Sequence, residues 1–270
     1  MDVLHSFVAA GLIARFVSSR ACGFALIVLL MTCWELFCRL GWLDIRFLPP
    51  PSVIGRALFA LLISLELAQH SLVTLKHVLS GYIVGASAGY ALGFMCGYAS
   101  RIYRLLEPTI EYLRPMPSVA LIPIGILFLG LGNGLNTFIV GWACSWPVFI
   151  NTMDGVRSTD RVLLNTGRTL GVKGWHLVWK IVVPSSLPWA FTGLRVSLGI
   201  AITVAVITEM IASGTGLGAF ILDTSLSYRV PEMYAGIIAI GLFGYFANQI
   251  FMRVERKVLG WQRGFLSAEN

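Results

Sequence analysis

The histidines and cysteines of this chain are too dispersed to form a metal or redox centre. The five cysteines all lie in apolar stretches, at positions 22, 33, 38, 96 and 144, and the four histidines do not cluster. Metal sites and thiol–disulfide centres need such residues at short, characteristic spacings. We therefore expect no metal on this chain, and we expect its cysteines to act as small core side chains.

The sequence also lacks the loop that cradles nucleotide phosphates. No Gly-Lys-Ser/Thr occurs, and no lysine is followed by serine or threonine. The run Gly214-x-Gly216-x-Gly218 faintly resembles a phosphate loop but has no strand before it, so we interpret it as a flexible turn. We expect no cofactor on this chain and no ATP hydrolysis by it.

Two ionisable residues, Arg195 and Glu209, fall within one long apolar stretch. Charges at membrane depth are costly and are often functional. Either residue can instead anchor a helix end by reaching toward the interface, or form a pair between subunits. We treat Arg195 and Glu209, together with the hydroxyls of Thr203 and Thr208, as candidates for lining a polar pathway.

The most polar stretch, residues 161–188, carries four positive charges in an otherwise apolar chain. Thr159 and Asp160 are suitable N-caps for a helix that runs to Leu170, and Gly171 suits the left-handed conformation that ends a helix. A second amphipathic helix is predicted from about Gly174, ending at Pro184. Pro188 would then lie in the first turn of the next span. Such a surface fits either a docked protein partner or the anionic inner leaflet.

The composition places these residues in a membrane protein. Of 270 residues, 57% are hydrophobic and 12% charged, and the mean hydropathy is +0.79. Soluble domains carry about 25% charged residues. The net charge of +7 is what cytoplasmic loops normally contribute, so we expect no nucleic-acid partner. The fold class predicted is all-α, with about six transmembrane helices, near 21–40, 78–99, 113–131, 134–152, 188–211 and 233–252.

The basic residues predict an orientation with both termini and the 153–187 loop in the cytoplasm. We expect a cytoplasmic segment over 1–20, a transmembrane domain over 21–252 that includes this loop, and a cytoplasmic tail over 253–270. The first apolar run lacks a cleavage site, which favours a retained span over a signal peptide. After three prolines, residues 54–67 are short and charged, which predicts an interfacial helix on the outer surface.

The second predicted span has glycine at every fourth position, namely Gly81, Gly85, Gly89, Gly93 and Gly97. This spacing keeps them along one stripe of a helix, where a second helix backbone can approach closely. We interpret the stripe as a packing surface; a surface that slides during transport is the alternative.

The spacing from Gly171 to Ile181 and Pro184 resembles the EAA…G…I-LP signature of permease subunits in binding-protein-dependent ABC importers. The resemblance covers roughly residues 45–262. Within it, further motifs resemble those of the nitrate/sulfonate/taurine branch of these permeases. They are Phe47-Leu48-Pro49-Pro50-Pro51-Ser52, Leu113-Arg114-Pro115-Met116-Pro117, Arg168-Thr169-Leu170-Gly171, Gly193-Leu194-Arg195, Glu209-Met210-Ile211-Ala212 and Ala212-Ser213-Gly214-Thr215-Gly216-Leu217-Gly218.

The resemblance implies a type I importer permease in the bacterial inner membrane, working as a pair, most simply a homodimer. Two cytoplasmic ATPases would carry ATP and Mg, each receiving the 160–171 helix in a cleft, and a periplasmic or lipid-anchored binding protein would deliver a small anionic solute. The residues implied in coupling are Asn165, Thr166, Gly167, Arg168, Leu170, Gly171, Ile181 and Pro184.

One departure stands out. The Glu-Ala-Ala positions of the signature fall on Asn165-Thr166-Gly167, so the carboxylate is missing and a glycine weakens the helix by roughly 0.5–1 kcal/mol relative to alanine.

Two rival functions make different demands on the sequence. A secondary transporter is expected to show paired inverted halves and a cluster of ionisable residues at the midplane. An intramembrane enzyme needs a converging catalytic set within the spans. Neither pattern is visible, since there is no second glycine ladder and His77 and His176 are assigned to opposite faces of the membrane.

Overall fold

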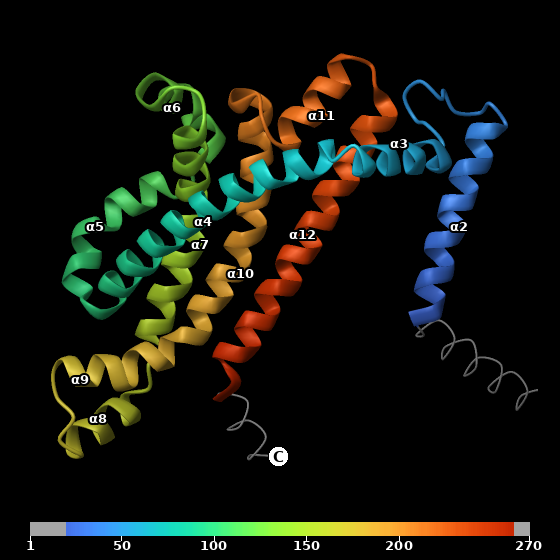
Figure 1. Ribbon diagram of the computed structural model, residues 1–270. Coiled ribbons are helices and arrows are strands. Elements are labelled where there is room, and N and C mark those ends of the chain that lie inside the picture. Colours follow the sequence, from blue (N-terminus) through green and yellow to red (C-terminus); the bar gives the residue numbers. More distant parts are fainter. Residues whose placement is uncertain (1–19, 262–270) are drawn as a thin grey trace, which may run out of the picture.

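The computed structural model describes residues 20–261, and these form an all-helical structure (Figure 1). The predictions for residues 1–19 and 262–270 lie outside the described residues. The five longest α-helices are α2 (Arg20–Arg39), α4 (Glu66–Tyr98), α7 (Asn133–Arg157), α10 (Val183–Thr208) and α12 (Val230–Val258). The shorter ones are α3 (Pro51–Ile63), α5 (Ser100–Leu113), α6 (Ile122–Leu129), α8 (Arg161–Thr169), α9 (Trp175–Leu177) and α11 (Leu217–Leu226).

Three continuous helical stretches within the described part are long and apolar enough to cross a membrane: Glu66–Tyr98, Trp175–Ser213 and Val230–Val258. A fourth results if Ser100–Leu113 and Ser118–Leu129 count as one bent span. Helices α2 and α7 coincide with two more of the predicted spans. The all-helical membrane class is therefore confirmed, with three to four candidate spans by length and composition.

The span predicted over 113–131, with kinks at Pro115 and Pro117, begins earlier and is broken in two. The chain breaks after α5 and resumes as a short 3₁₀ turn, Ser118–Leu121, followed by α6, with a bend of 87° between the two halves. Pro115 and Pro117 lie in the break. Because proline has no N–H and clashes with the preceding turn, two prolines at this spacing end the helix and do more than kink it.

Two boundaries on the N-terminal side also differ from prediction. The expected interfacial helix over 54–67 is α3, which begins at Pro51 and gives way to α4 at a sharp corner where Leu65 has a φ of +59°. Helix α4 then begins at Glu66 and not near residue 78. Its 33 residues span about 50 Å, longer than the roughly 30 Å hydrocarbon core, and Figure 1 shows it running obliquely across the other helices.

The prediction that Pro184 ends a helix was also wrong. A π-helical segment, Val178–Val182, joins α9 to α10, so that Trp175–Ser213 is one helical stretch with Pro184 in the first turn of α10 and Pro188 inside it. A π segment shifts the hydrogen-bond pattern by one residue, and membrane helices tolerate prolines where the local helix adjusts in this way.

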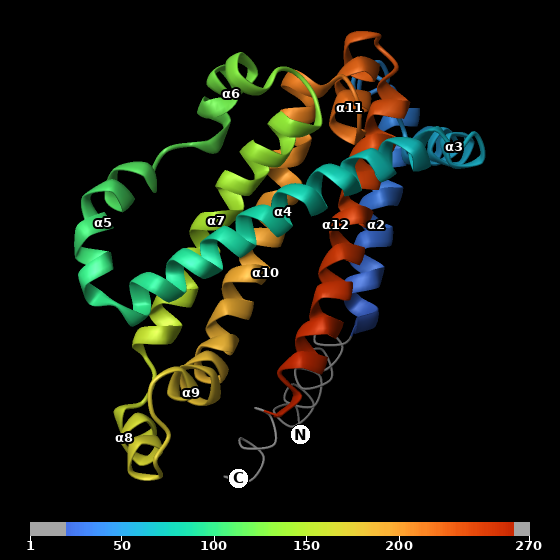
Figure 2. The same cartoon turned by 60° about the vertical axis from the view of Figure 1, so that its left-hand side comes forward.

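The centre of the fold is the packing of α4 and α10 on the two sides of α7 (Figures 1 and 2). Its buried side chains include Val78 of α4, Ile139 and Val140 of α7, and Ala201 and Ala205 of α10. At one end of this core lie α8 and α9, and at the other lie α3, α6 and α11.

The glycines of α4 lie directly on the backbone of α7. A Cβ at Gly85, Gly89 or Gly93 would overlap the backbone of Gly141, Ser145 or Phe149, respectively. At the two ends of the stripe, Gly81 meets Val140, and Gly97 meets Met153 and Val156. The residue numbers of the contacted positions on α7 increase together with those of the α4 glycines, so the two chains run in the same direction where the helices cross. A side chain on this stripe would force them apart.

Candidate functional site

Helix α8 and the turn after it form a compact corner. Asp160 caps the helix by accepting a hydrogen bond from the Val162 N–H at 2.8 Å. At the other end, the Gly171 N–H donates to the Arg168 carbonyl and the Val172 N–H donates to the Gly167 carbonyl, with Gly171 at a φ of +81°. This is a Schellman termination, which needs a left-handed residue at the position of Gly171.

Gly167 lets α8 pack tightly against the following helix. Its α carbon is buried, and a Cβ there would overlap Cδ1 of Ile181 and lie 3.1 Å from Cδ1 of Leu177. Two residues of the predicted coupling set, Gly167 and Ile181, are therefore in contact. The glycine that weakens α8 as a helix is the residue that allows it to lie against the helix beginning at Trp175. We name residues 160–182 the knuckle.

The rest of the predicted coupling residues lie on the outside of the knuckle or near its exit. Asn165, Thr166, Arg168, Leu170 and Gly171 are exposed, and Pro184 is half-buried in α10. Three apolar side chains of the same corner are also exposed, namely Val162 (69%), Leu163 (51%) and Leu170 (77%). A cavity of about 380 Å³ beside Gly171 is bordered by three basic side chains: Lys173, His176 and Lys180.

The predicted pathway residues lie in α10 and in the π-helical segment Glu209–Ser213 that continues it, and they divide into two groups. Arg195 and Thr203 are exposed: Arg195 Nη2 donates to the Met252 sulfur at 3.5 Å, and the Thr203 hydroxyl donates to the Gly199 carbonyl at 3.1 Å. Thr208 and Glu209 are fully buried, and the Thr208 hydroxyl donates to the Val204 carbonyl at 2.8 Å. The structure therefore does not bring the four together in one place.

Glu209 is the centre of a buried polar network. Its Oε1 lies 2.8 Å from Nδ1 of His77, whose Nε2 is 2.9 Å from Oδ1 of Asn133. Its Oε2 accepts from the Thr74 hydroxyl and from the Gly218 N–H, each at 2.9 Å. The network joins α4, the start of α7 and the start of α11, and it satisfies a carboxylate that would otherwise be costly to bury.

The glycine-rich turn that follows is shaped around this carboxylate. Gly214 and Gly216 have φ values of +64° and +97°, and a Cβ on Gly216 would overlap the Glu209 carboxylate. The Leu217 N–H donates to the Thr74 hydroxyl at 2.8 Å. The turn is held by hydrogen bonds, and it leads into α11, a helix that the sequence did not predict.

A family comparison decides which class of protein carries these features. The protein-family model described as binding-protein-dependent transport system inner membrane component matches residues 89–260, from the middle of α4 to beyond the end of α12. The chain belongs to this family. It is thus the permease component of a binding-protein-dependent ABC importer, a multi-pass inner-membrane protein that is not itself catalytic.

Individual permeases align over most of the chain. It is 29% identical over 243 residues to the putative aliphatic sulfonates transport permease protein SsuC of Bacillus subtilis (strain 168), covering 90% of this chain and 88% of the relative. It is 30% identical over 186 residues to the nitrate import permease protein NrtB of Leptolyngbya laminosa, covering 69% and 67%.

A solved structure supports the fold. A chain of the MetNI methionine ABC transporter, in inward-facing conformations, superposes with a TM-score of 0.57 at 16% identity, covering 67% of this permease and 93% of that chain. At this identity the match is evidence for a shared fold and for nothing further.

Sequence reasoning found Glu209 in this permease but missed its partners. Thr74, His77 and Asn133 are up to 135 residues away from it, and no local pattern marks them. The available signal was that an ionisable residue buried in a membrane helix needs a partner. With the N-terminus in the cytoplasm, the start of the predicted span 78–99 and the end of the span 188–211 both face outward, which places His77 and Glu209 at the same end of the bundle.

Proposed function

We propose that this permease pairs with a second copy of itself to form a pathway for a small anionic solute. Candidate solutes are a sulfonate, taurine, nitrate, bicarbonate or an organic carboxylate. The relatives with sulfonate and nitrate in their names support this range. Membership of the family argues against an ion-gradient-driven transporter, the alternative function.

The knuckle is the observation that carries the coupling role. Its exposed apolar side chains, on a rigid corner at one end of the bundle, are suited to enter a cleft in another protein. We propose that each of two cytoplasmic ATPases binds one knuckle, and that ATP and Mg are held by those subunits. A periplasmic or lipid-anchored binding protein is proposed to deliver solute at the opposite end.

The proposed topology has about six spans with both termini and the knuckle in the cytoplasm. Residues 1–20, 21–252 and 253–270 remain the proposed cytoplasmic, membrane and tail segments. Within the 153–187 loop, α7 continues to Arg157 and the next long helical stretch begins at Trp175, so the connection, which contains α8, is 158–174. Labelling of single cysteines placed at Lys173 and Tyr228 in right-side-out and inverted vesicles tests this orientation.

The decisive functional experiment is reconstitution. The permease, purified with its ATPase and placed in liposomes with the binding protein, should accumulate solute only when ATP is hydrolysed. Uptake that persists with a hydrolysis-deficient ATPase and follows an imposed ion gradient would overturn the proposal.

A further inference from the structure

The break between α5 and α6 leaves non-helical backbone between the two halves of the bent helix pair. Residues 114–117 separate the two halves of the 87° bend, and this segment contains Arg114. Non-helical backbone at membrane depth persists only where protein covers it or where it lines a water-filled cavity.

A cavity of about 730 Å³ lies beside this break, between α5 and the second half of α7. Its polar lining consists of Tyr103, Glu111, Arg114, Asp154 and Arg157. The Arg157 guanidinium lies over the Tyr103 ring, 4.1 Å from its centroid. Within residues 20–261, neither arginine forms an ion pair with a carboxylate. Glu111 and Asp154 line the same cavity, but no carboxylate of the described residues lies within ion-pair distance of either arginine, so both guanidinium groups keep N–H donors for an anion that enters.

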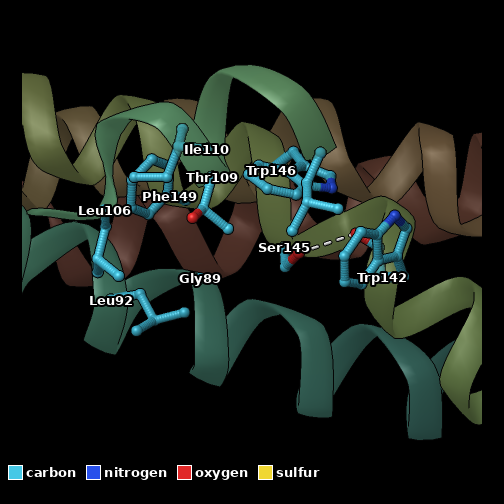
Figure 3. A pocket seen from close by; sticks show the side chains of 10 residues that line it. Gly89, Leu92, Leu106, Thr109, Ile110, Trp142, Ser145, Trp146 and Phe149 are labelled. Carbon is cyan, nitrogen blue, oxygen red and sulfur yellow. Dashed lines mark hydrogen bonds between the residues drawn. The ribbon is translucent and has the colours of Figure 1, made fainter. Parts of the chain in front are cut away.

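A second cavity of about 260 Å³ adjoins the first, and Ile110 and Phe149 line both. Figure 3 shows its wall, with Trp142, Trp146 and Phe149 from α7. Successive rings of this wall meet edge to face, with centroids 5.5 and 6.2 Å apart. The rest of the lining comes from α4, including Leu92, and from α5, including Leu106 and Thr109. The lining is almost wholly apolar, so this cavity suits a hydrocarbon group.

We propose that the two cavities form one site for an organic anion, whose charged head binds Arg114 and Arg157 and whose aliphatic group occupies the tryptophan-lined cavity. This rests on the proposed import of anions and names the substrate class: aliphatic sulfonates or carboxylates of several carbons, in preference to nitrate or bicarbonate. Cavities of about 150 Å³ hold a benzene molecule, so 260 Å³ accommodates a short alkyl chain.

The two parts of the site have separable effects on affinity. Each methylene transferred from water into the apolar cavity should tighten binding about fourfold. The head group should depend on charge-assisted hydrogen bonds from the guanidinium groups, so removing one of them should weaken binding about tenfold.

Calorimetric binding of hexanesulfonate, methanesulfonate and nitrate to the permease–ATPase complex, in nanodiscs of phosphatidylcholine, measures both effects. Hexanesulfonate should bind best. Arg114→Gln should weaken both sulfonates about tenfold, whereas Arg104→Gln, an exposed α5 arginine outside both cavities, should not. Thr109→Trp should remove the preference for hexanesulfonate while methanesulfonate binding remains; Tyr112→Trp, on the exposed side of α5, is its control.

Three results would overturn the inference: equal affinity for the two sulfonates, an unchanged affinity in Arg114→Gln, or loss of hexanesulfonate binding in nanodiscs that contain phosphatidylglycerol. The last would identify the cavities as a site for anionic lipid. Size-exclusion profiles of each variant establish that it is folded. ATP-dependent uptake by the unmodified complex is scored separately, so the site can fail while the importer function stands.

Discussion

Nδ1 of His77 lies 2.8 Å from Oε1 of Glu209, although 132 residues separate them in the chain. The imidazole is 2% exposed and the carboxylate 0%, so water does not reach the pair. Glu209 also accepts hydrogen bonds from the Thr74 hydroxyl of α4 and from the Gly218 N–H at the start of α11. Together these bonds hold α4 against the glycine turn that precedes α11. They hold one end of the bundle, while the knuckle lies at the other.

Replacing Glu209 with alanine should destabilise the permease by about 3 kcal/mol, because it leaves the partners of the carboxylate buried and unsatisfied. Glu232→Ala is the matched control, since Glu232 pairs with Arg229 at 3.3 Å in a partly exposed site and should contribute less than about 1 kcal/mol. Thermal unfolding in detergent measures both. Equal losses in the two variants would show that the buried network is not stabilising.

A methyl group on the glycine stripe should also destabilise the protein. Gly85→Ala would push a Cβ into the backbone of Gly141, at a cost of about 1–3 kcal/mol. Gly55→Ala, in α3 with open space around it, should be neutral or stabilising by up to about 1 kcal/mol. Comparison of their unfolding midpoints checks the prediction, and a stable Gly85→Ala protein would mean that α4 and α7 are not tightly packed.

Coupling should depend on the conformation of Gly171. A valine at a φ of +81° is strained by roughly 1–2 kcal/mol and should distort the end of α8. We expect Gly171→Val to insert normally, while solute uptake per ATP hydrolysed falls severalfold. Gly241→Ala, in α12 with no atom near its added Cβ, controls for loss of a glycine. Unchanged stoichiometry of uptake to hydrolysis in Gly171→Val would count against the docking role of the knuckle.

The exposed apolar residues of the knuckle should determine affinity for the ATPase. Leu170→Glu places a charge where the partner is expected to bury a side chain, so association should weaken about tenfold or more. Leu226→Glu changes a comparably exposed leucine (72%) at the other end of the bundle and should leave association intact. Co-purification of the tagged permease with the ATPase, titrated against concentration, distinguishes the two. An ATPase that binds both variants equally must dock elsewhere.

The sequence by itself determined the features that arise from neighbouring residues. The apolar runs predicted an all-helical membrane protein, Asp160 and Gly171 marked the two ends of α8, and the four-residue glycine period predicted a stripe on one helix. These features depend on interactions within one or two helical turns, where side-chain type and backbone preference act directly. The proline-containing break at 114–117 was also local, but we interpreted it as a kink.

Only the tertiary structure decided which distant groups meet. It placed His77 and Thr74 against Glu209, Gly167 against Ile181, and the glycine stripe of α4 on α7. It also turned two predicted pathway hydroxyls to different sides of α10, with Thr203 exposed and Thr208 buried. Such contacts depend on helix rotation and register. The rise of 1.5 Å per residue is the same in every α-helix, so backbone geometry does not choose which helices pack together. Side-chain packing between the helices makes that choice.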